Sequence, residues 1–140
     1  MIYIVASTFY EELSDELIRA ASDSLNDLVT NDFDIIRVPG AFEIPGTVSQ
    51  VIKKNKADLI VALGCVIKGE TPHFDFIATE TSRSIMKMIV QYDIPIGFGV
   101  LTTNNMKQAI DRSKNDATNK GREAMEAALS VYKIYNKIKA

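Results

Sequence analysis

The chain has 140 residues and a formal net charge of −2, with 46% hydrophobic and 24% charged residues. This composition is ordinary for one globular domain spanning residues 1–140 and excludes a disordered chain. Lys and Arg are scattered along the sequence, which argues against a nucleic-acid partner, because such a partner requires a concentrated basic face.

Short apolar runs rich in β-branched residues alternate with longer segments of helical period. The runs predict four strands, at Ile2–Ser7, Phe33–Val38, Asp58–Val66 and Pro95–Leu101. Each run is apolar over most of its length, as expected of strands that helices cover on both faces.

Apolar stripes at helical spacing follow the strands and predict five helices. The first stripe ends with Leu28 and Val29 and has a helix start at Ser14-Asp15-Glu16. The five stripes are Leu13–Val29, Ile44–Ile52, Ile77–Ile89, Met106–Ser113 and Gly121–Tyr135. This alternation predicts an α/β fold with a four-stranded parallel sheet and helices on both faces. We expect the flavodoxin-like strand order 2-1-3-4, whose two exposed edges invite cover by neighbouring subunits.

Several classes of protein are disfavoured by what the sequence lacks. Cys65 is the only cysteine, so an intrachain disulfide is impossible and a reducing compartment is expected. Without a signal peptide or a membrane-length apolar stretch, a cytoplasmic protein with no membrane partner is expected. One histidine, one cysteine and no spaced carboxylate cluster argue against a metal site. The glycine motifs of nucleotide binding and the nucleophile-elbow motif are also absent.

In an open α/β sheet, ligands bind beyond the carboxyl ends of the strands. The four segments that leave those ends carry the unusual residues of this sequence. Phe9 follows the first strand, Glu43 the second and His73 the third, and Phe98 belongs to the fourth. These segments predict a binding site along one rim of the sheet.

The segment around His73 carries the most chemistry. The pair Thr71-Pro72 is typical of a helix N-cap followed by proline at the first helical position. The N–H groups of Glu70 and Thr71 and the positive end of the helix then form a place where an anion could dock. A lone histidine more often only bonds a backbone carbonyl, but beside an anion site we favour His73 as a base.

Other candidates have stronger structural alternatives. Arg112 could clamp a phosphate because a guanidinium binds its oxygens in fork geometry, although a solvated helix charge is commoner. Phe9 and Phe98 could stack on a planar ring, although such residues are more often core. Glu43 is equally consistent with a ligand acceptor and with a first-turn complement to the helix dipole. Cys65 follows an apolar strand and is expected to be inert.

Four motifs occur together in a specific order and spacing. They are Val38-Pro39-Gly40-Ala41-Phe42-Glu43-Ile44-Pro45, Gly69-Glu70-Thr71-Pro72-His73-Phe74-Asp75, Phe98-Gly99-Val100-Leu101-Thr102-Thr103 and Asn119-Lys120-Gly121-Arg122-Glu123-Ala124. In this combination the chain resembles the lumazine synthase family over nearly its whole length. The resemblance implies a cofactor-free transferase of riboflavin biosynthesis. Its expected substrates are 5-amino-6-(D-ribitylamino)uracil and 3,4-dihydroxy-2-butanone 4-phosphate, and its products 6,7-dimethyl-8-ribityllumazine, phosphate and water.

The resemblance also implies roles for individual residues. Pyrimidine contacts would come from Phe9 and Phe98, with Lys120 near the ring. Further implied roles are those of the ribityl-binding residues Ala41, Phe42 and Glu43, the backbone-lining residues Cys65, Val66 and Ile67, the phosphate-binding residues Glu70, Thr71 and Arg112, and the proton shuttle His73. One imidazole can serve several proton-transfer steps of such a condensation.

The resemblance further implies a homopentamer with active sites between subunits, and in some members an icosahedral shell of 60 subunits. The spacing from Arg112 to Asn119 lacks an insertion typical of pentamer-only relatives, so we expect shell competence. A separate riboflavin synthase is a further expected partner. Asp116 stands where the family commonly has lysine, which should weaken the positive potential near the phosphate.

Two other functions remain open on the sequence. An archaeal-type riboflavin synthase resembles this fold and uses lumazine as its substrate. A non-catalytic lumazine- or flavin-binding shell protein would also share the fold. Retention of His73, Arg112 and Glu43 together argues against the second alternative.

Overall fold

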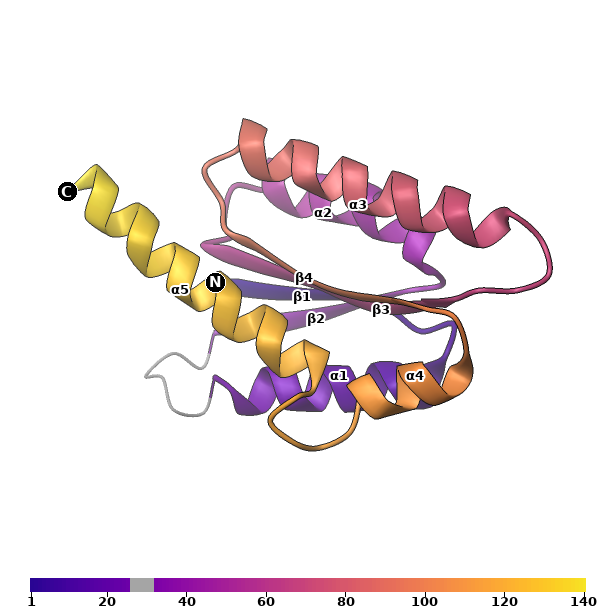
Figure 1. Ribbon diagram of the computed structural model, residues 1–140. Coiled ribbons are helices and arrows are strands. Elements are labelled where there is room, and N and C mark those ends of the chain that lie inside the picture. The colour runs from indigo at the N-terminus through magenta and orange to yellow at the C-terminus, as the bar shows by residue number, and fades with distance from the viewer. Residues whose placement is uncertain (26–31) are drawn as a thin grey trace.

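A four-stranded parallel sheet forms the centre of the molecule in the computed structural model, which describes residues 1–25 and 32–140 (Figure 1). Its strands are β1 (Ile2–Ser7), β2 (Phe33–Val38), β3 (Leu59–Ile67) and β4 (Ile96–Thr103). They lie in the order β2-β1-β3-β4, which confirms the predicted topology. The bounds of β1 and β2 agree with the apolar runs.

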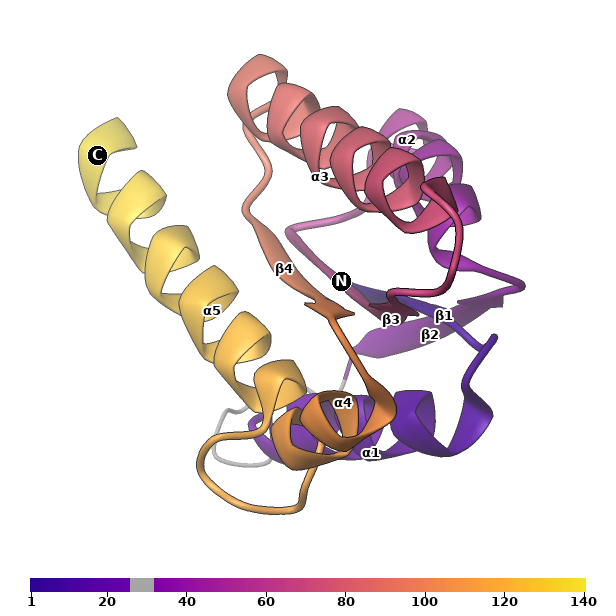
Figure 2. The same cartoon turned by 45° about the vertical axis from the view of Figure 1, so that its right-hand side comes forward.

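Helices cover both faces of the sheet (Figure 2). One face carries α2 and α3, and the other carries α1, α4 and α5. The helices are α1 (Glu11–Asp23), α2 (Ile44–Lys53), α3 (His73–Gln91), α4 (Met106–Arg112) and α5 (Lys120–Lys139), with a short 3-10 helix, η1 (Ala41–Glu43), before α2. No helix in the described part of the chain combines the length and apolarity needed to cross a membrane.

The sheet separates two apolar cores because successive side chains of a strand point to opposite faces. In β1, the fully buried Ile4 belongs to the core beneath α1 and α5. Its neighbour Val5, also fully buried, belongs to the core beneath α2 and α3. All six residues of β1 are buried, which explains why this strand reads as a continuous apolar run.

Some predicted boundaries were wrong, for local reasons. Helix α1 begins at Glu11, before the predicted start at Ser14, whose buried hydroxyl donates to the Ser7 carbonyl and does not cap the helix. Helix α3 is assigned from His73, one residue after the proline predicted to open it. Helix η1 was not predicted, because a segment of three residues carries no periodic stripe. The predicted helical positions Leu28 and Val29 lie outside the described residues.

Close approach of α5 to the sheet and to α1 requires glycine. A Cβ atom on Gly97 of β4 would lie 2.3 Å from the carbonyl oxygen of Ala124 in α5. A Cβ atom on Gly121, in the first turn of α5, would lie 2.2 Å from the carbonyl oxygen of Leu17 in α1. Both contacts are with backbone atoms, which cannot move aside as a flexible side chain can. These glycines therefore set the depth at which α5 packs.

The two helical glycines Gly121 and Gly46 form a matched pair for testing this packing. Gly121→Ala should destabilise the fold by about 1–3 kcal/mol or more, because α5 must move away from α1. Gly46→Ala should be neutral or stabilising, since nothing lies within 4 Å of its added Cβ atom and alanine favours a helix. Thermal unfolding measures both changes, and equal midpoints for the two variants would contradict the close approach.

Candidate active site

A cavity of about 660 Å³ opens at the carboxyl edge of the sheet, beside β1 and β3. The start of α1, the η1 segment and the start of α3 form its walls. Its lining residues are Phe9, Tyr10, Gly40, Ala41, Phe42, Glu43, Cys65, Val66, Ile67, Gly69, Thr71, His73, Phe74, Phe76 and Ile77. The predicted rim site is therefore a real concavity, large enough for a small-molecule ligand.

Aromatic side chains dominate the mouth of this cavity. Phe9, Phe42 and Phe76 are 72%, 61% and 67% exposed, which is unusual for phenylalanine. Tyr10 meets the Phe9 ring edge to face, with the ring centroids 4.9 Å apart and an interplanar angle of 78°. Exposed ring faces at the mouth of a cavity are suited to a planar, partly apolar ligand.

Two ionisable side chains face this aromatic surface from different elements. Glu43 ends η1, and its N–H donates to the carbonyl oxygen of Gly40 at 3.2 Å. His73 is the first residue of α3, and its N–H donates to Oγ1 of Thr71 at 3.4 Å. Both side chains are exposed to solvent. The cavity thus offers a carboxylate that accepts hydrogen bonds and an imidazole that can exchange protons.

The floor of the cavity is the end of β3, formed by Cys65, Val66 and Ile67. Burial raises the pKa of the Cys65 thiol to about 11. The thiol is therefore protonated at neutral pH, which agrees with the expectation that it is not a nucleophile. The floor contributes apolar surface.

The structure does not bring all predicted site residues into this cavity. Phe98, Lys120, Glu70 and Arg112 are absent from its lining. Phe98 is 40% exposed on the edge strand β4. Arg112 ends α4, on the opposite face of the sheet from α3, and its guanidinium donates to the Gln108 carbonyl at 3.1 Å.

Lys120 begins α5, also on the α4 side of the sheet, and its ammonium group lies 3.0 Å from the Glu123 carboxylate. Within one chain the predicted site is therefore split into two groups. Phe9, Glu43 and His73 lie at the cavity, whereas Arg112 and Lys120 lie at the ends of two helices beyond the sheet.

Sequence reasoning missed several residues of the lining. Tyr10, Phe74 and Phe76 contribute aromatic surface, and Gly40 and Gly69 contribute backbone. The signal for the aromatic residues was their position next to Phe9 and His73, in segments that leave strand ends.

Asp116 is held within its own loop. Its carboxylate accepts from the backbone N–H of Thr118 at 2.8 Å and from the Thr118 hydroxyl at 2.5 Å. These hydrogen bonds hold the pKa of Asp116 below its usual value. Asp116 therefore has a local turn-forming role that a lysine could not fill. Across the described ranges, no three His, Cys, Asp or Glu side chains come together as a metal site.

Comparison with known proteins places this sequence in a family. The family model described as 6,7-dimethyl-8-ribityllumazine synthase matches residues 1–136. A protein of that name from Campylobacter hominis is 40% identical over 99% of this chain and 90% of its own. Its namesake from Nautilia profundicola is 41% identical over 98% of this chain and 90% of its own. The protein of that name from Nitratidesulfovibrio vulgaris is 40% identical over 96% of this chain and 88% of its own.

The family model covers the four strands, the residues that line the cavity, and α5 up to residue 136. The chain belongs to the 6,7-dimethyl-8-ribityllumazine synthase family.

Proposed function

We propose that this chain condenses 5-amino-6-(D-ribitylamino)uracil with 3,4-dihydroxy-2-butanone 4-phosphate, as a transferase of riboflavin biosynthesis. The product is 6,7-dimethyl-8-ribityllumazine, released with phosphate and water. Family membership supports the reaction. The observation that carries the proposal to this molecule is the cavity, which combines exposed aromatic rings, a carboxylate and the chain's one imidazole.

In this proposal the pyrimidine lies against Phe9, and its ribityl chain extends along η1. Ala41, Phe42 and the Glu43 carboxylate hold the ribityl chain. Its hydroxyl groups donate hydrogen bonds, and an ionised carboxylate is a strong acceptor for them. Cys65, Val66 and Ile67 support the ring from the end of β3. The catalytic contribution of this surface is the fixed orientation of the reacting amine.

The ketose phosphate lies at the start of α3 in this proposal. Glu70 and Thr71 bind the phosphate through their backbone N–H groups at the positive end of the helix. Arg112 adds a guanidinium fork. The amine attacks the ketone carbonyl and water leaves, phosphate is then eliminated, and ring closure releases further water. Each step moves a proton, and in this proposal His73 carries it.

Arg112, Phe98 and Lys120 reach this cavity in the proposal from an adjacent copy of the chain. Their place outside the cavity of their own chain supports such a shared site, as does their exposure or partial exposure. We propose that the chain forms a cytoplasmic homopentamer. The proposal extends to the closure of such pentamers into a 60-subunit shell and to a riboflavin synthase as a partner. Exposed apolar side chains such as Met86, Val90 and Ile138 support self-association.

Absorbance detection of lumazine from the two purified substrates tests the function. Lumazine should form, and incubation with lumazine alone should yield no riboflavin. Riboflavin made from lumazine alone would instead identify an archaeal-type riboflavin synthase. A chain that converts neither the two purified substrates nor lumazine alone would be a binding or shell protein.

His73→Ala should lower kcat by about 10²-fold or less, because one acid–base group is lost while the amine and ketone still react slowly unaided. Pyrimidine binding should change little. Thr79→Ala, at an exposed position of the same helix outside the cavity lining, is the control. Steady-state kinetics over a range of pH measures the effect. A kcat that equals the parent value at every pH would rule out the proton shuttle.

Arg112→Ala should raise KM for the ketose phosphate far more than KM for the pyrimidine, because a charge-assisted fork is lost. Inorganic phosphate should compete with the ketose phosphate in the parent and much less in this variant. Lys107→Ala removes a positive charge from the same helix, where Lys107 pairs with Asp111 at 3.0 Å, and should change neither KM. An equal rise of both KM values in Arg112→Ala would show that Arg112 is structural.

A further inference from the structure

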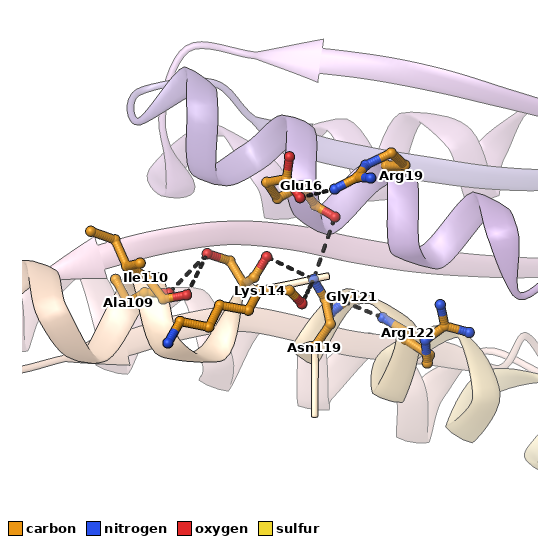
Figure 3. Close-up of polar contacts among 9 residues, drawn as sticks. Glu16, Arg19, Ala109, Ile110, Lys114, Asn119, Gly121 and Arg122 are labelled. Carbon is orange, nitrogen blue, oxygen red and sulfur yellow. Dashed lines mark hydrogen bonds and ion pairs between the residues drawn. The ribbon is translucent and has the colours of Figure 1, made fainter. Parts of the chain in front are cut away.

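Asn119 is a fully buried polar residue immediately before α5, and its side chain has many partners. Its Nδ2 group donates to the carbonyl oxygens of Ser113 at 2.9 Å and Lys114 at 3.0 Å. Its Oδ1 atom accepts from the backbone N–H groups of Gly121 at 2.7 Å and Arg122 at 3.3 Å. Figure 3 shows Asn119 at the centre of these contacts.

These partners belong to different elements. The carbonyls of Ser113 and Lys114 lie directly after α4. The N–H groups belong to the first turn of α5, where a helix leaves donors unsatisfied. A third, longer contact joins Nδ2 to the Glu16 carbonyl of α1 at 3.4 Å. One buried amide therefore links the end of α4 to the start of α5, and its NH2 group also lies near the middle of α1 (Figure 3).

The two cationic residues of the proposed site flank this junction directly. Arg112 precedes Ser113, whose carbonyl oxygen Asn119 binds, and Lys120 follows Asn119 in the chain. The loop between the helices, residues 114–118, is exposed, and its hydrogen bonds through Asp116 to Lys114 and Thr118 lie within the loop. The side chain of Asn119 supplies a direct link between the end of α4 and the start of α5.

We propose that Asn119 is a positioning residue for substrate phosphate, which acts by fixing the end of α4 that carries Arg112. The inference rests on the proposed function, in which Arg112 binds the ketose phosphate. The donor half of the amide is the part that matters, because only Nδ2 reaches the carbonyls after α4. The acceptor half caps α5 and is a structural requirement of the fold.

Asn119→Ser separates these two halves without changing charge. A serine hydroxyl is a good N-cap acceptor for α5, but it is too short to replace both donor contacts. Asn105→Ser is the matched control, because Asn105 is the N-cap of α4 and its side chain accepts from the Gln108 N–H at 2.9 Å. Serine can keep that role.

Asn119→Ser should raise the Kd of inorganic phosphate and KM of the ketose phosphate about tenfold, since small displacements of a binding group are costly. KM of the pyrimidine should stay near the parent value. Asn105→Ser should change neither the Kd of inorganic phosphate nor KM of either substrate. In an Arg112→Ala background, Asn119→Ser should add little, because residues that act through one another are not additive.

Calorimetric phosphate binding needs no turnover, so the inference and the proposed function can fail separately. If the parent makes no lumazine but Asn119→Ser still weakens phosphate binding, the function fails and the positioning role stands. Unchanged phosphate affinity, an equal rise of both KM values, a full effect in the Arg112→Ala background, or a parent that binds no phosphate would overturn the role.

Thermal unfolding and light scattering confirm that each variant is folded and assembled. If Asn119→Ser does not fold, Asn119→Asp replaces it, because aspartate keeps the α5 cap and the side-chain size but cannot donate when ionised. Asn105→Asp is then the charge-matched control. The same selective loss of phosphate affinity is expected. If neither Asn119 variant folds, Asn119 is a determinant of folding alone and the positioning role is overturned.

Discussion

The parallel pairing of β1 with β2 and β3 is the constraint on which the rest of the structure depends. Ser7 pairs with Val38, and Ala6 pairs with Leu63, so the three strands reach their carboxyl ends at the same edge of the sheet. Segments that are far apart in the sequence therefore leave the sheet side by side, as expected of an open α/β fold. The start of α1, η1 and the start of α3 surround one cavity for this reason.

Much of the fold could be predicted, because strands buried on both faces read as apolar runs. The bounds of β1 and β2 agree with such runs, and the strand order follows from the alternation of strands and helices. The start of α1 could not be predicted, because Ser14 has the residue type of a cap while its hydroxyl bonds Ser7 in the core. The close contacts of α5 at glycine residues could not be predicted from the sequence either, because they depend on distances between elements.

The candidate site was predicted only in part. Phe9, Glu43 and His73 follow strand ends, and the sheet geometry brought them together as expected. Arg112 also follows a strand, but its helix turns to the opposite face. This helix comes after the last strand, so the handedness of βαβ crossovers does not determine its face. The sheet and its two packed cores then separate His73 from Arg112 within one chain. The proposal of a site shared between copies follows from this separation and from the family.

Subunit complementation tests the shared site most directly. Equal amounts of His73→Ala and Arg112→Ala chains would be dissociated, mixed and reassembled, with light scattering to confirm exchange. In a closed ring with random mixing, about a quarter of the sites should contain both native residues, and lumazine formation should rise well above that of either variant reassembled alone. Exchange without any gain in activity would contradict a site built from two copies of this chain.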